Sequence, residues 1–165
     1  MPDTPDYLDR IREHAQGKDP LAAQAQSPAL IAELIANIPS DRLTTSPAPG
    51  KWSIAEILAH LAEDEIATAW RYRQMVEHPG IDLSGFDQDL WASLGNYAAR
   101  NPHDSLALYR LLREANLHFL HSLTPEQWES FGIHAERGRI TVRDLATHMA
   151  GHDANHIVQI QKLLS

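Results

Sequence analysis

The sequence predicts an all-α protein, a four-helix bundle with short extra helices in the connections. Three observations lead to this prediction. Four long segments repeat apolar residues at helical spacing, and two of the four begin with a clear cap, the capping box at Ser53 and the cap at Thr141. No segment shows the apolar–polar alternation that is typical of a half-buried strand.

Each long helix has a start signal of its own. The signal is either a proline in the first turn, or a capping residue ahead of the apolar repeat. In Ser53-Ile54-Ala55-Glu56, for example, the hydroxyl and the carboxylate can each satisfy a backbone amide at the helix start. The predicted spans are about 20–38, 53–78, 104–123 and 141–164.

The connections contain weaker signals. We predict a short helix over 86–99 that contains Trp91, and a short helical piece near Trp128 that a second capping box opens at Thr124. The segment 132–140, around Gly138, is expected to be a loop.

Length and composition limit the classes of protein that fit. A chain of 165 residues suits a single domain, 1–165, with about 1–18 at its periphery. The net charge of −8 and the scattered arginines exclude nucleic acid as the main partner. Neither a membrane-length apolar run nor a secretory signal is visible, so we expect no membrane partner and a cytoplasmic protein. The chain has no cysteine, and any thiolate must therefore come from another molecule.

Two histidines of the last predicted helix lie where core residues should lie. His152 and His156 fall within a stripe formed by Val142, Leu145, Met149 and Ile160. Residues four apart are neighbours on a helix, so both imidazoles can reach one metal ion. From spacing alone, a pair of core histidines hydrogen-bonded to backbone or carboxylate is about equally compatible. His148 lies at the edge of the stripe and is interpreted as a rim residue.

A third ligand must come from another helix, and His60 is the best candidate. It lies in the other strongly capped helix, on a polar seam beside an apolar face. The alternative is a half-exposed histidine paired with Asp64 or Glu56.

Two blocks of this sequence resemble the DinB/YfiT-like superfamily of metal-binding four-helix proteins. They are residues 49–61, PGKWSIAEILAHL, and residues 141–160, TVRDLATHMAGHDANHIVQI. The resemblance covers the chain from about residue 20, and it implies that His60, His152 and His156 are the metal ligands. It also implies an up-down-down-up helix order with a long crossover, a packing role for Trp52, and a homodimer.

Three imidazoles would leave one coordination position open, and nitrogen ligands suit a divalent transition metal, with zinc first and nickel next. Characterised members of the superfamily that this sequence resembles include transferases and isomerases that use low-molecular-weight thiols. We therefore expect a metal-dependent thiol S-transferase that joins a small-molecule thiol to an electrophile. The alternatives are a metal-dependent hydrolase, with Glu63 or Asp64 as the base, and a non-catalytic, stress-related metal-binding or dimerisation module. Residues expected to line the pocket are Asp64, Arg71, Tyr72 and Trp91.

Overall fold

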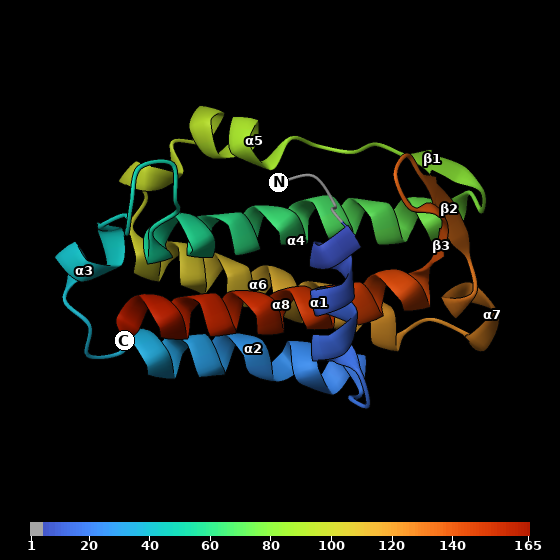
Figure 1. The fold of residues 1–165 in the computed structure, drawn as a ribbon. Coiled ribbons are helices and arrows are strands. Elements are labelled where there is room, and N and C mark those ends of the chain that lie inside the picture. Colours follow the sequence, from blue (N-terminus) through green and yellow to red (C-terminus); the bar gives the residue numbers. More distant parts are fainter. Residues whose placement is uncertain (1–4) are drawn as a thin grey trace.

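The computed structural model describes residues 5–165 and confirms the four-helix bundle (Figure 1). Helices α2 and α8 run in one direction, and α4 and α6 run in the opposite direction. This is the up-down-down-up order. No helix in the described part of the chain combines the length and apolar character that crossing a membrane would require. The four bundle helices are α2 (Pro20–Ile35), α4 (Ile54–Glu77), α6 (Pro102–His121) and α8 (Val142–Leu164).

The parallel arrangement of α4 and α6 requires a long crossover. After α4, the chain returns along the outside of the bundle before α6 begins (Figure 1). The crossover carries the helix α5 (Gln88–Leu94) and the 3-10 turn η1 (Tyr97–Ala99), where a helix over 86–99 was predicted. Shorter connections hold α3 (Ser40–Thr44) and α7 (Pro125–Trp128).

The predicted caps determine where α4 and α8 begin. Ser53 accepts a hydrogen bond from the backbone amide of Glu56, whose carboxylate accepts one from the Ser53 amide at 2.8 Å. Thr141 and Asp144 make the same reciprocal pair at the start of α8. Because these pairs fix the first turn of each helix, they also fix which later side chains face the bundle interior.

The prediction that 132–140 is a loop was wrong. The structure has a three-stranded sheet in which β2 (Phe131–His134) lies parallel to β1 (Ile81–Leu83) and antiparallel to β3 (Gly138–Thr141). Strands of three or four residues are too short to show a clear alternation. Gly132 permits the close approach of β1, because a Cβ atom there would lie 2.6 Å from the Leu83 side chain.

The N-terminal helix α1 (Pro5–Ala15) crosses over α8 on the outside of the bundle (Figure 1). Ile11 is buried against α8, so this helix contributes to the core although it was expected to be peripheral. Its contact depends on Gly151, because a Cβ atom there would collide with the backbone carbonyl of Ile11.

Two apolar clusters fill the two ends of the bundle. One cluster contains Ile31, Ile57 and Tyr109, and the other contains Met75, Leu120 and Leu145. Along α8 the buried polar residues lie in the sequence between the residues of these two clusters, and along α4 the same is true of Asp64, Glu65 and Thr68, while His60 lies at the inner end of the first cluster. The middle of the bundle is therefore a buried polar layer.

One arginine connects all four bundle helices within this layer. Arg113 on α6 forms a two-pronged ion pair with Asp153 on α8, at 2.8 and 3.1 Å. It also donates to Glu65 on α4 at 2.6 Å and to Gln24 on α2 at 2.9 Å. Burial disfavours the charged form of Arg113 and acts to lower its pKa. The interactions with Asp153, Tyr109 and Glu65 have the larger effect, and they raise the pKa of Arg113 well above its usual value.

We predict that Arg113→Met lowers the free energy of unfolding by about 3–5 kcal/mol, because Asp153 and Glu65 would remain buried without their cation. Urea unfolding followed by circular dichroism measures the change. Arg110→Met, at an exposed position on the same helix, is the control and should change stability by less than about 0.5 kcal/mol. Equal stability of the Arg113 variant and the unmodified protein would show that the network is not needed for folding.

Candidate metal centre

The structure brings the three predicted histidines together. His60 comes from α4, and His152 and His156 come from successive turns of α8. The Nε2 atom of His152 lies 3.1 Å from Nε2 of His60 and 3.2 Å from Nε2 of His156. Among the described residues, these three form a group whose ligand atoms all lie within 4.8 Å of one another. All three side chains are buried, His60 to 1% exposure.

The three rings direct the same nitrogen, Nε2, toward the centre of the group. The outer nitrogen of His156, Nδ1, lies 3.0 Å from the Gln159 side-chain oxygen. The outer nitrogen of His152 lies 3.7 Å from the Asp64 carboxylate and has no closer hydrogen-bond partner. The oxygens beside the outer nitrogens of His156 and His152 favour protons there, and this leaves the Nε2 lone pairs of these two rings directed inward.

This arrangement fits a metal ion. Inward lone pairs on neighbouring rings cannot satisfy one another, because each close nitrogen pair needs a proton or a cation between its members. Nitrogens of a tetrahedral zinc site are about 3.3 Å apart, close to the separations seen here. Three imidazoles are also a typical ligand set for a catalytic zinc, which keeps a fourth position for another molecule.

Burial keeps the imidazoles neutral, as metal ligation requires. Desolvation, with the charge of His152 as a further cause, lowers the pKa of His156 to about 3. Desolvation also lowers the pKa of His152 to about 4 and that of His60 well below its usual value. At neutral pH, a cation therefore does not have to displace protons from these rings.

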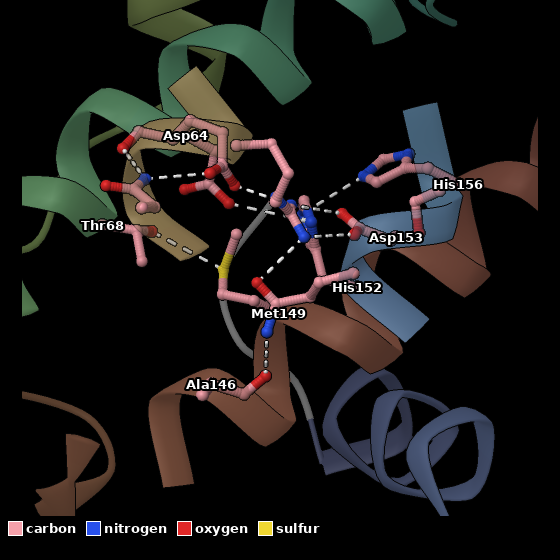
Figure 2. A network of polar contacts seen from close by, with 12 residues as sticks. Asp64, Thr68, Ala146, Met149, His152, Asp153 and His156 are labelled. Carbon is pink, nitrogen blue, oxygen red and sulfur yellow. Dashed lines mark hydrogen bonds and ion pairs between the residues drawn. The ribbon is translucent and has the colours of Figure 1, made fainter. Parts of the chain in front are cut away.

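A cavity of about 500 Å³ lies beside the cluster. His152 and Asp64 belong to its wall, and Figure 2 shows Asp64 and Thr68 of α4 facing Met149 and His152 of α8. The Thr68 hydroxyl donates to the Met149 sulfur at 3.6 Å. Further residues of the wall come from α1, the crossover, the end of β2 and the β2–β3 turn, and include Tyr7, Phe86, Asp87, Asp89, His134, Glu136 and Arg137.

The other residues singled out from the sequence have different positions. Asp64 and Arg71 line the cavity, as expected. His148 also lines it, with its ring 6.3 Å from that of His152, and lies outside the group of three. Trp52 packs against the His60 ring at 5.1 Å.

Three expected pocket or base residues do not line the cavity in the described chain. The Glu63 carboxylate pairs with Arg100 at 2.8 Å. Tyr72 is buried in one of the two apolar clusters. Trp91 stacks on Phe86, with ring centroids 4.3 Å apart.

Sequence reasoning missed two sets of residues. His134 at the end of β2 and Arg137 in the β2–β3 turn line the cavity, and a segment expected to be a loop gave no way to place them. The sequence did contain a signal for the buried position of Arg113. It follows Tyr109 by four positions and precedes Leu120 by seven, on the buried stripe of α6.

Fold and site together define a class: a helical bundle with a buried, open-sided three-histidine centre. The family model of the DinB superfamily matches residues 23–160, so this chain belongs to the DinB superfamily.

Curated relatives and solved structures agree with this assignment. The chain is 25% identical over 137 residues to a protein of Oceanobacillus iheyensis, covering 82% of this chain and 78% of that one. It is 23% identical to YfiT of Bacillus subtilis, with 82% and 77% covered. The names of both relatives assign them provisionally to the metal-dependent hydrolases.

In structure, the chain matches YfiT with a TM-score of 0.80 at 20% identity, over 97% of this chain and 87% of YfiT. It matches a mycothiol-dependent maleylpyruvate isomerase with a TM-score of 0.66 at 12% identity, over 86% of this chain and 59% of the isomerase. At such identities these matches show the fold. The histidine cluster and the curated relatives together support a protein that binds a divalent metal.

We predict that the purified protein carries about one equivalent of divalent metal, and that His152→Ala or His156→Ala removes most of it. Elemental analysis after dialysis measures the metal content. His118→Ala, at an exposed position on α6, is the matched control and should keep full occupancy. Full occupancy in both ligand variants would place the metal elsewhere.

The lowered pKa values also predict how the metal-free protein responds to acid. The unfolded chain takes up protons on histidine near pH 6.5, whereas folded His156 resists protonation until about pH 3. Between these values the unfolded state binds more protons, so stability falls as the pH falls below 6.5.

Relative to His156→Gln, the chelator-treated unmodified protein should lose on the order of 1–2 kcal/mol more stability between pH 7 and pH 5. Urea unfolding at the two pH values measures this difference. Equal losses in the two proteins would mean that His156 is not buried in its neutral form.

Proposed function

We propose that this chain is a metal-dependent thiol S-transferase, which joins a low-molecular-weight thiol to a small electrophile. The observation that carries the proposal is a three-nitrogen centre whose ligand His152 also lines a cavity large enough for a small molecule. The chain has no cysteine, so a sulfur nucleophile would have to enter this cavity from solution.

The metal would supply Lewis acidity, stabilising a thiol as its more nucleophilic thiolate. Zinc is our first choice for the ion and nickel the second, because nitrogen ligands suit both. Neutral imidazoles add no negative charge to the centre, so a bound divalent cation would keep its full positive charge and attract an anionic ligand. That charge balance favours a thiolate over a neutral molecule.

The chain's own residues hold the reacting groups in place. Asp64 is on the outer side of His152, where its carboxylate faces Nδ1 and favours the tautomer with the proton on that nitrogen. Met149 and Thr68 close the wall next to this pair. The low exposure of the three histidines limits the access of water to the reacting sulfur.

Hydrolysis is the second candidate, and one observation favours it. The Asp64 carboxylate lines the same cavity as His152, so it could accept a proton from water that attacks a substrate. The other base considered from the sequence, Glu63, is paired with Arg100. The names of the curated relatives also point to hydrolysis. The homodimer and the cytoplasmic location stay predictions.

The two candidates differ in whether a thiol is required. Metal-loaded protein should accelerate the reaction of a soluble thiol with a chromogenic aryl halide at least about tenfold over chelator-treated protein, because only the loaded form stabilises the thiolate. His152→Ala should abolish the acceleration and His118→Ala should keep it. The thiolate displaces the halide ion, and the absorbance of the aryl thioether product measures the rate.

Nitrophenyl ester turnover without any thiol would support the hydrolase instead, and Asp64→Asn should then lower that rate by about 10²-fold or more. Metal-loaded protein that accelerates neither reaction would contradict both enzymatic proposals.

A further inference from the structure

On two rings of the cluster, the outer contacts made by described residues are longer than a hydrogen bond. Trp52 packs against the His60 ring, with ring centroids 5.1 Å apart. The Asp64 carboxylate lies 3.7 Å from Nδ1 of His152, which exceeds the usual length of a hydrogen bond. An aromatic face, or a carboxylate at this distance, constrains the position of a ring proton less than a hydrogen bond of normal length does.

The outer side of the third ring, His156, has a closer partner. Gln159 follows His156 by three residues, about one turn of α8, and its side-chain oxygen lies 3.0 Å from Nδ1. Gln159 is half-buried, so water competes less for this contact than it would on an open surface. An amide oxygen only accepts hydrogen bonds, and the contact therefore requires the ring proton to be on Nδ1.

The direction of this hydrogen bond decides whether His156 can bind a metal ion. A neutral imidazole has one proton, and with that proton on Nδ1 the lone pair of Nε2 is directed to the centre of the cluster. If the amide nitrogen of Gln159 faced the ring instead, it would donate to Nδ1, and the ring proton would move to Nε2. A ring in that form directs an N–H group at the cluster and cannot be a metal ligand.

The partner of His156 is also neutral. A carboxylate is a common partner for the outer nitrogen of a metal-binding histidine, and it adds negative charge to the centre. The carboxylate of Asp153, which adjoins the cluster in the chain, is bound at both oxygens by Arg113, at 2.8 and 3.1 Å. The amide of Gln159 thus fixes the proton of His156 as a carboxylate would, without the charge.

We propose that Gln159 is a positioning residue for the metal ion: its neutral side-chain oxygen fixes the ligating form of His156 and adds no negative charge to the centre. The first effect strengthens metal binding, and the second favours an anion at the open coordination position. This inference rests on the metal binding in the proposed function, but not on the choice between thiol transfer and hydrolysis.

Zinc affinity, measured by competition with a chromophoric chelator, tests the first effect. Gln159→Met, which keeps the length of the side chain but has no oxygen, should bind zinc about 10–100-fold more weakly. Gln159→Glu has a stronger acceptor and should bind zinc about tenfold more tightly. Gln161→Glu adds the same charge at an exposed position of α8, and as the matched control it should change the affinity by less than about threefold.

Azide binding to the cobalt-loaded protein, followed by the visible absorption of Co²⁺, tests the second effect. Gln159→Glu should bind azide about tenfold more weakly than the unmodified protein, because the added carboxylate repels an anion. Gln161→Glu should keep the azide affinity of the unmodified protein. The Gln159→Glu change therefore moves the two affinities in opposite directions, which a residue with only a structural role would not do.

Equal zinc affinities for the unmodified protein and the Gln159 variants would overturn the inference, and so would a Gln161→Glu variant that reproduces both effects of Gln159→Glu. Gln159→Asn keeps the amide but not its reach, so it should behave like Gln159→Met and covers the case in which the methionine variant does not fold.

The same measurements separate this inference from the proposed function. Absence of both catalytic reactions, with the expected order of zinc affinities intact, would overturn the proposed reactions alone. A protein that binds no zinc, or that keeps its zinc in the His152→Ala variant, would overturn the metal centre and this inference with it.

Discussion

A single buried guanidinium constrains the centre of this bundle. Arg113 needs partners on three other helices, and it finds them in Asp153, Glu65 and Gln24. Two of these residues adjoin the site directly, since Asp153 follows His152 and Glu65 follows Asp64 in the chain. A shift of α4 or α8 along its axis would break a charge pair that is buried from water, which is strongly unfavourable. The register that holds Arg113 in place is therefore also the register that brings the histidines together.

The two apolar clusters explain how the bundle can contain three buried imidazoles between them. Each unpaired buried imidazole would cost about 1–3 kcal/mol. The apolar clusters at the two ends contribute the hydrophobic free energy that tolerates such a cost, and a cation would remove much of it. Metal binding and folding are then thermodynamically linked.

Features that depend on residues close together in the chain could be predicted from the sequence. Capping boxes at Ser53 and Thr141 and helical periodicity gave the long helices, and the four-residue spacing of His152 and His156 identified the ligand pair. Placing His60 beside them also required the family resemblance, because spacing alone left a surface alternative open. The pairing of β1 with β2 joins segments about fifty residues apart, and single-sequence periodicity carries no information on such a pairing. The β2–β3 hairpin, whose turn places Arg137 at the cavity, is local, but its strands are too short to show an alternating pattern.

The absence of a side chain at Gly151 fixes how closely α1 approaches α8. Since Tyr7 of α1 lines the cavity, and Gly151 immediately precedes a histidine of the cluster, the width of the cavity depends on this one helix crossing. An alanine at the equivalent position of a homologous chain would push the N-terminal helix outward and make room for a bulkier molecule. The residue that precedes the first histidine of the C-terminal pair is thus an indicator, readable from sequence, of which relatives can bring an N-terminal helix this close to the cavity.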